Sequence, residues 1–379
     1  MKKLFAADKL LVGTFAILLL VGLFFFLSAS LGVLASNTTK FISILQTQLL
    51  LGFLGGIIAF LIVIRIPSTF WQKYGSFFFF GGLILTSLVY VPGLGFTHGG
   101  ATRWINLGFV SFQPADFLKA GTLIYLAALY SKFLQKKKDI KNNPNKNFTL
   151  FSLLAPALII LTLSGLVLLP QPDTKSLVLI FILTSVILFV VDLPYKIIFT
   201  LLGLFLIGVV VLVLTKPYIA SRVETFINPE NDPQGSSYQL KQSLIAIGSG
   251  GIIGQGFGQS IQKFNFLPEP QGDSIFAVVG EEMGFIGSFI IIGLYLVFFL
   301  RGIKLALSLN TSFARLFFIG FFALFITQTF LNIGSSIGLI PLTGVPLPLM
   351  SQGGTSLLVT CSLFGIIIRL LYEEQKIKV

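Results

Sequence analysis

The strongest constraint on this sequence is a series of apolar runs, each long enough to cross a lipid bilayer. A membrane-spanning helix needs about 20 mostly apolar residues. The chain is 55% hydrophobic and only 11% charged, whereas a soluble domain carries about a quarter charged residues. We therefore predict an all-α polytopic membrane protein that forms a single membrane domain over residues 1–379. The predicted spans, about ten in number, are 10–35, 43–64, 74–92, 114–131, 149–169, 175–192, 195–215, 275–300, 316–337 and 354–372.

The positions of the basic residues predict the orientation of these spans. If both termini are cytoplasmic, most of the 26 Lys and Arg residues fall on the cytoplasmic side, as the positive-inside rule requires. Segment 132–147 is then a basic cytoplasmic loop, and segment 216–274 is a large extracytoplasmic loop with short helices. The first apolar run is longer than the core of a signal peptide, so we expect an uncleaved helix.

The net charge of +12 raises the question of an acidic partner. We exclude nucleic acid, because most of the basic residues sit in short loops where they set topology. A zinc site built from His and Cys is also excluded, since His98 and Cys361 are the chain's single residues of each type.

Charged residues at the edges of the predicted spans are candidates for function, because an ionisable group near the bilayer centre costs roughly 3 kcal/mol. Asp116 and Lys119 lie three apart on a helix, so they can pair. The pair is either purely structural or part of a cavity, with Lys119 facing a substrate phosphate. Arg103 is either a loop residue or a phosphate ligand, since a guanidinium suits phosphate.

Segment 266–284 is the most informative part of the sequence. Asp273 lies where the large external loop enters the eighth predicted span, and Glu281 follows eight residues later. A carboxylate at an apolar boundary has a raised pKa, which suits a general base near neutral pH. The alternative is that Asp273 caps the helix N-terminus.

Segment 242–258 has six glycines, a pattern typical either of close backbone packing or of a phosphate cradle.

Segment 338–356 has three prolines and four glycines, so a helix cannot continue through it. We expect a rigid external loop. Irregular backbone at membrane depth is tolerated only where it is buried in protein or lines a cavity.

Six sequence blocks together resemble the SEDS family (shape, elongation, division and sporulation), and more closely its cell-division branch than its rod-elongation branch. The resemblance covers nearly the whole chain. Its blocks are 28–30, 100–108 (GATRWINLG), 113–119 (QPADFLK), 246–258, 266–287 (FLPEPQGDSIFAVVGEEMGFIG) and 338–356.

The resemblance implies a peptidoglycan glycosyltransferase that polymerises lipid II on the outer face of the cytoplasmic membrane, at the division septum. It implies Asp273 as the catalytic base and a class B penicillin-binding protein as partner, with other division membrane proteins nearby. A divalent cation near Asp273 and Glu281 is left open as a cofactor. The expected substrate-binding residues are Arg103, Asp116, Lys119, Lys241, Lys263, Glu281, Ser351 and Gln352.

The sequence also departs from the family pattern. Asp116 stands where the family usually has Glu, and Gln352 stands where it usually has Tyr. Gln271 and Gly272 replace the His-Thr that often precedes the aspartate, so histidine cannot assist Asp273 here.

Two other functional classes remain open at this point. A lipid II flippase would also need many helices and buried charges, but it should show polar residues near the midplane and often an inverted repeat. Neither pattern is visible in the sequence. A non-catalytic scaffold for division proteins is the third interpretation.

Overall fold

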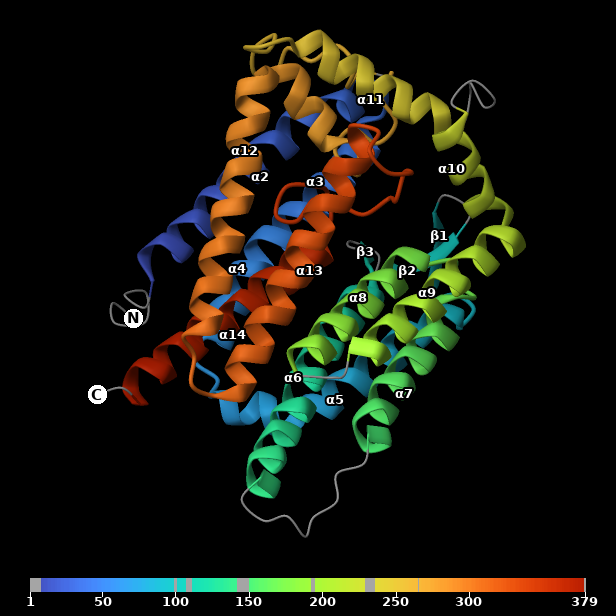
Figure 1. Cartoon of the computed structure of the whole chain (residues 1–379). Coiled ribbons are helices and arrows are strands. Elements are labelled where there is room, and N and C mark those ends of the chain that lie inside the picture. Colours follow the sequence, from blue (N-terminus) through green and yellow to red (C-terminus); the bar gives the residue numbers. More distant parts are fainter. Residues whose placement is uncertain are drawn as a thin grey trace.

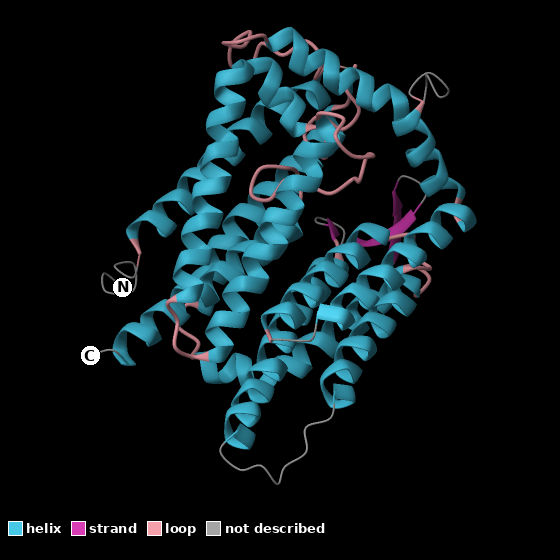
Figure 2. Cartoon of the chain, in the orientation of Figure 1, coloured by secondary structure: helices cyan, strands magenta, loops and turns pink. Residues whose placement is uncertain are grey.

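The structure, a computed structural model, describes residues 8–98, 101–106, 111–141, 150–191, 195–228, 236–264 and 266–377. It is a bundle of long helices with one small sheet, which lies at about mid-height on the right of the view (Figures 1 and 2). In the described residues the helices are α2 (Lys9–Ser36), α3 (Thr38–Gln46), η1 (Thr47–Leu54), α4 (Gly55–Val63), α5 (Ser68–Ser87), η2 (Leu88–Tyr90), α6 (Pro114–Lys141), α7 (Leu150–Leu168), α8 (Thr174–Val190), α9 (Tyr195–Thr215), α10 (Pro217–Ile227), α11 (Ser236–Gly250), α12 (Ile275–Leu307), α13 (Ser312–Ser336) and α14 (Gly354–Ile377).

Every predicted span coincides with a helix or with a continuous set of helices. Among the described residues, six helical segments are long and apolar enough to cross a membrane, and a seventh qualifies if the bent pair α9–α10 is counted as one span. The part of α7 from Leu153 to Leu168 and the whole of α8 are shorter apolar helices. The helical class is confirmed, whereas the number of ten spans and their orientation stay predictions.

One loop prediction needs correction. Helix α6 continues to Lys141, so the first part of the predicted loop 132–147 is helical, and residues 142–147 lie outside the described residues. The connection before α6 contains strands β1 (Gly95–His98), β2 (Ala101–Asn106) and β3 (Ser111–Phe112), which pair in the antiparallel order β1-β2-β3. The predicted short helices of segment 216–274 are α10 and α11.

Helix α12 is broken at Gly284, where φ is 64° and ψ is −164°. Only glycine adopts such a conformation readily, and an added Cβ would overlap the backbone nitrogen of Gly254. The loop after α11 satisfies the backbone groups that the break frees. Gln255 N–H donates to the Glu281 carbonyl at 3.0 Å, and Phe285 N–H donates to the Gly251 carbonyl at 2.9 Å.

A buried ion pair joins the same loop to α12 and α2. The Lys263 ammonium lies 2.8 Å from the Glu282 carboxylate, and both side chains are 0% exposed. Lys263 also donates to Ser28 Oγ of α2 at 3.0 Å and to the Gly258 carbonyl at 2.8 Å. All three protons of the ammonium therefore have acceptors, as a buried charge requires.

Removing one member of this pair leaves the other charge buried and unpaired, which costs about 3–5 kcal/mol. We expect Lys263→Met to lower the thermal unfolding temperature of the detergent-purified protein strongly. Adding Glu282→Gln should restore part of the loss, because the remaining group is then neutral. Lys40→Met, at an exposed site, is the matched control. Equal unfolding temperatures for Lys263→Met and Lys40→Met would refute a stabilising role.

Candidate functional site

Asp273 lies immediately before α12, at the end of the bundle that carries the sheet, α10 and α11. Ser274, and not Asp273, occupies the N-cap position of α12, so the alternative that Asp273 serves as the N-cap is wrong. The side chain is half-buried. Within the described part of the chain, no hydrogen bond or ion pair occupies its carboxylate. The group is therefore available for chemistry.

Three charged side chains converge on Gly344, in the loop between α13 and α14. A Cβ built on Gly344 would lie 3.2 Å from Asp273 Oδ2 and 3.6 Å from a guanidinium nitrogen of Arg222. The Lys175 ammonium donates to the Gly344 carbonyl at 2.6 Å, and Arg222 donates to the Leu342 carbonyl at 3.0 Å. Two cations from α8 and α10 thus flank the Asp273 carboxylate.

Arg103, on strand β2, is the third cation near the Asp273 carboxylate. Its guanidinium donates to the Gln171 carbonyl at 3.0 Å and to the Pro172 carbonyl. Burial raises the pKa of Asp273 above its ordinary value. Lys175, Arg222 and Arg103 oppose that rise because they favour the charged carboxylate, whereas Glu269 adds to it.

Loop residues from the second half of the chain hold the backbone around Asp273. The amide of Asn332, on α13, donates to the Asp273 carbonyl at 2.9 Å and to the Val345 carbonyl at 2.8 Å. Ser351 Oγ donates to the Gly272 carbonyl at 2.7 Å, and Gln352 N–H donates to the Gln271 carbonyl at 2.7 Å. Ser351 and Gln352 therefore orient the catalytic candidate through its backbone.

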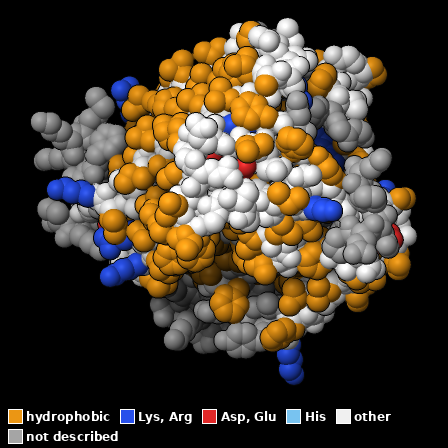
Figure 3. Space-filling model, turned by 90° about the horizontal axis from the view of Figure 1, so that it is seen from above, with side chains coloured by type: hydrophobic (Ala, Val, Ile, Leu, Met, Phe, Trp, Pro, Cys, Tyr) orange, Lys and Arg blue, Asp and Glu red, His pale blue; other side chains and the backbone are white. Residues whose placement is uncertain are grey.

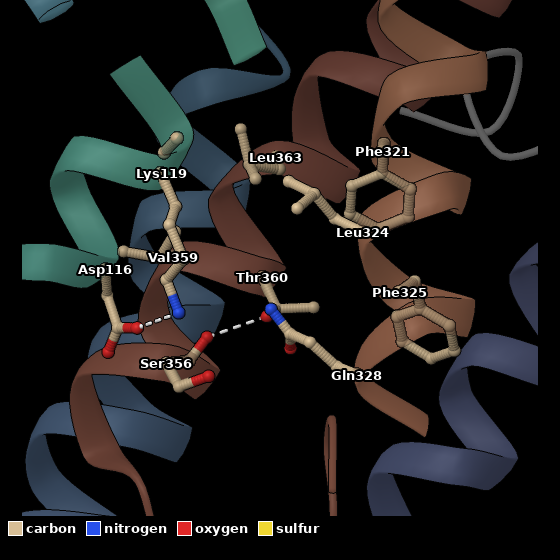
Figure 4. Close-up of a pocket in the computed structure, with 11 residues that line it drawn as sticks. Asp116, Lys119, Phe321, Leu324, Phe325, Gln328, Ser356, Val359, Thr360 and Leu363 are labelled. Atoms are coloured by element: carbon tan, nitrogen blue, oxygen red, sulfur yellow. Dashed lines mark hydrogen bonds and ion pairs between the residues drawn. The ribbon is translucent and has the colours of Figure 1, made fainter. Parts of the chain in front are cut away.

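Asp116 and Lys119 pair as predicted, with 2.7 Å between carboxylate and ammonium. They line a cavity between α6, α13 and α14 (Figure 4). The polar ends of Lys119, Gln328, Ser356 and Thr360 turn toward one another, and apolar side chains cover the other wall (Figure 4). Structural pairing and cavity lining, the two alternatives, therefore coexist.

The cavity lies close below Asp273. Gln328 lines it, and Asn332, which holds the Asp273 carbonyl, follows four residues later on α13. Four helical residues rise about 6 Å. A partly apolar cavity that holds the Asp116–Lys119 ion pair therefore lies about one helical turn along α13 from the Asp273 cluster.

Three of the predicted substrate-binding residues lie elsewhere. Lys263 is occupied by Glu282. Glu281 is buried, and it accepts hydrogen bonds from Ser260 Oγ and from the backbone N–H groups of residues 261 and 262. Lys241 is exposed on α11. The structure thus gives Lys263 and Glu281 a role in fixing the loop, and it does not join Lys241 to the Asp273 cluster.

The donor set around Asp273 does not suit a resident metal ion. Among the described residues, no three His, Cys, Asp or Glu side chains come together as a metal site would need. Glu281, the second predicted ligand, uses both carboxylate oxygens on the 260–262 turn.

Sequence reasoning missed Lys175, Arg222, Asn332 and Gly344. Lys175 and Arg222 could have been noticed as further cations on the predicted external face, the same face as Arg103.

Seen from above, the end of the molecule that carries α10 and α11 shows a few acidic and basic side chains between large apolar areas (Figure 3).

Comparisons with known proteins agree with this architecture. Residues 8–376 match the family described as "Cell cycle protein", which groups FtsW, RodA and SpoVE proteins. The chain belongs to this family. It is 37% identical over 320 residues to an Escherichia coli O6:H1 protein named "Probable peptidoglycan glycosyltransferase FtsW", covering 83% of this chain and 74% of that protein. It is 36% identical over 364 residues to stage V sporulation protein E of Bacillus subtilis, covering 95% and 96%.

Solved structures share the fold. A chain from a peptidoglycan synthase complex, described as coordinating polymerization and crosslinking, matches with a TM-score of 0.75 at 25% identity, covering 97% of this chain and 98% of that one. The crystal structure of the rod shape determining protein RodA of Thermus thermophilus matches with a TM-score of 0.68 at 25% identity, covering 97% of each chain.

Gly344 offers a test of the geometry around Asp273. Its φ is +65°, so a side chain there costs about 1–2 kcal/mol, and the new methyl group would press on Asp273. We expect Gly344→Ala to lower the unfolding temperature. Gly293→Ala is the matched control, because Gly293 is inside α12 and nothing lies within 4 Å of its Cβ position. Its stability should be equal or slightly higher. If Gly344→Ala unfolds at the same temperature as Gly293→Ala, the described crowding is wrong.

Proposed function

We propose that this protein is a peptidoglycan glycosyltransferase that polymerises lipid II. The observation that carries the proposal is the Asp273 carboxylate, which has no bonded partner in the described chain and is surrounded by the cations of Arg103, Lys175 and Arg222. The names of its relatives support the same activity.

In the proposed reaction, Asp273 accepts the proton of the acceptor's 4-hydroxyl as that oxygen attacks the donor sugar. The bond from the sugar to the undecaprenyl diphosphate breaks with inversion, and negative charge gathers on the leaving diphosphate. Arg103, Lys175 and Arg222 stabilise that charge, because preorganised cations act on charge that develops in the transition state. A raised pKa makes Asp273 a better base than an ordinary carboxylate.

The second cationic group, Lys119, serves the lipid end of the substrate. Its cavity is lined by polar groups on one side and by Phe321, Leu324 and Phe325 on the other. A lipid-linked substrate has a polar head and an apolar tail, so it would lie across this boundary. The paired Asp116 keeps Lys119 in place.

We further propose that the Asp273 end of the bundle faces the outside of the cytoplasmic membrane, and that the protein acts at the division septum. The partner would be a class B penicillin-binding protein within a larger set of division membrane proteins. The similarity to a chain of a peptidoglycan synthase complex supports a crosslinking partner.

The central experiment compares wild type with Asp273→Asn in a gel assay of lipid II polymerisation. The substitution keeps the shape and removes the base. We expect a loss of at least about 100-fold, as for removal of a general base, with an unchanged unfolding temperature. The assay is run with and without the cognate penicillin-binding protein. Polymerisation by Asp273→Asn at the wild-type rate would rule out the base. If labelled lipid II crosses liposomes without being polymerised, the protein is a flippase instead.

The pH dependence of polymerisation tests the electrostatics of the site. Asp273 must be ionised, so activity falls as the pH drops through its pKa, which burial raises. The Lys175 cation lowers that pKa. Lys175→Gln should therefore raise it and move the acidic limb of the rate profile to higher pH. Lys40→Gln, at an exposed site, should leave the limb in place. If the acidic limb of the Lys175→Gln profile lies at the same pH as in the wild type, the proposed effect of Lys175 on the pKa of Asp273 is wrong.

A further inference from the structure

The loop between α11 and α12 lies deeper in the molecule than its sequence suggests. Three contacts place it along α2, at positions spaced by one helical turn each. Phe257 stacks on Phe24 with 3.8 Å between ring centroids, Lys263 bonds to Ser28, and a Cβ on Gly32 would overlap the Lys263 carbonyl. The loop is therefore beside the helix and not above its end.

The positions of these contacts along α2 show how far the loop lies from the end of that helix. The helix ends at Ser36, so Phe24 is twelve residues, or about 18 Å along the axis, from that end. Both α2 and α12 are long and apolar enough to span a membrane. The hydrocarbon core is about 30 Å thick, so a loop packed between Phe24 and Gly32 lies within the bilayer half nearest to Asp273.

The backbone of the loop meets the condition that lipid imposes. Irregular chain at membrane depth needs its polar groups satisfied within the protein. Besides the bonds of Gln255 and Phe285, Gly256 N–H donates to the Glu282 carbonyl at 3.0 Å, and Ile286 N–H donates to the Ile252 carbonyl at 3.1 Å. The broken helix and the loop thus complete each other's hydrogen bonds.

The side chains of the loop follow the same logic. The one charged residue in segment 250–264 is Lys263, and it is buried against Glu282. The exposed side chains carry no charge: besides Gln255 and Gln259 they are apolar, and the most exposed are Ile252 at 70%, Ile253 at 81% and Ile261 at 59%. They continue the exposed apolar face of α12, where Phe285 is 69% and Phe289 is 66% exposed. In a loop surrounded by water, a charged side chain is more stable when it is solvated than when it is buried.

We propose that residues 251–264 form a re-entrant loop whose Ile252, Ile253 and Ile261 side chains contact the acyl chains of the leaflet on the Asp273 side. The occupant of this surface is lipid, because the surface is continuous with the outward face of a spanning helix and exposes no charge. The bilayer then fixes the depth of the loop and, through the backbone bonds at the α12 break, of the segment that carries Asp273.

Site-directed nitroxide labelling tests the proposal without reference to catalytic activity. Cys361 is the only cysteine and is buried, so single-cysteine variants can be made in a Cys361→Ser background. Ile253→Cys is labelled in the full-length protein, purified and reconstituted in phosphatidylcholine–phosphatidylglycerol liposomes. Lys40→Cys, exposed in the first turn of α3, is the aqueous control. Collision of the label with oxygen, which dissolves in lipid, is compared with collision with a water-soluble nickel chelate.

We expect the label at Ile253 to collide often with oxygen and rarely with the nickel chelate, as a label in lipid does. The label at Lys40 should collide often with the nickel chelate, as a label in water does. Ile261→Cys provides a second position, should Ile253→Cys not fold. If labels at both positions collide with nickel as often as the Lys40 label does, the loop lies in water and the proposal is wrong. Weak collision with both reagents at both positions would indicate a protein contact, such as a second copy of the chain, and would also overturn it.

Discussion

The buried Lys263–Glu282 ion pair, together with the break in α12, is the constraint on which the upper half of the molecule depends. A buried charge or an open backbone group has no water to solvate it, so it needs partners within the protein. Lys263 therefore finds acceptors on Glu282, Ser28 and Gly258, and the carbonyls freed at Gly284 find donors in the preceding loop. These contacts fix the loop, and the loop leads directly into the segment that carries Asp273.

Around Asp273 the same low solvation produces a chemical advantage. Burial raises the pKa of the carboxylate, and the three nearby cations act in the opposite direction. The cations come from β2, α8 and α10, which are far apart in sequence. Their convergence with the Gly344 loop brings isolated charges together around one carboxylate, which is the arrangement on which the proposed glycosyl transfer rests. The cavity that holds the Asp116–Lys119 pair lies one helical turn further along α13.

Much of this could be read from the sequence. The apolar runs predicted the helices because a span needs length and apolarity, which are local properties. The spacing of Asp116 and Lys119 predicted their pairing, since helical geometry sets that distance. Asp273 was identified by its position at the edge of an apolar run and by the family blocks. The same reasoning failed for Lys263 and Glu281, because it could not tell a charge that faces substrate from one that faces another charge.

The sequence by itself therefore determined the class of protein, the helices and the catalytic candidate, because these depend on composition and on spacing along one chain segment. Only the tertiary structure decided which charges meet. Lys175 and Arg222 lie near Asp273 because α8, α10 and the Gly344 loop pack together. Lys263 is not part of that cluster because it is buried between α2 and α12. Such convergence depends on long-range packing, and no local pattern records it.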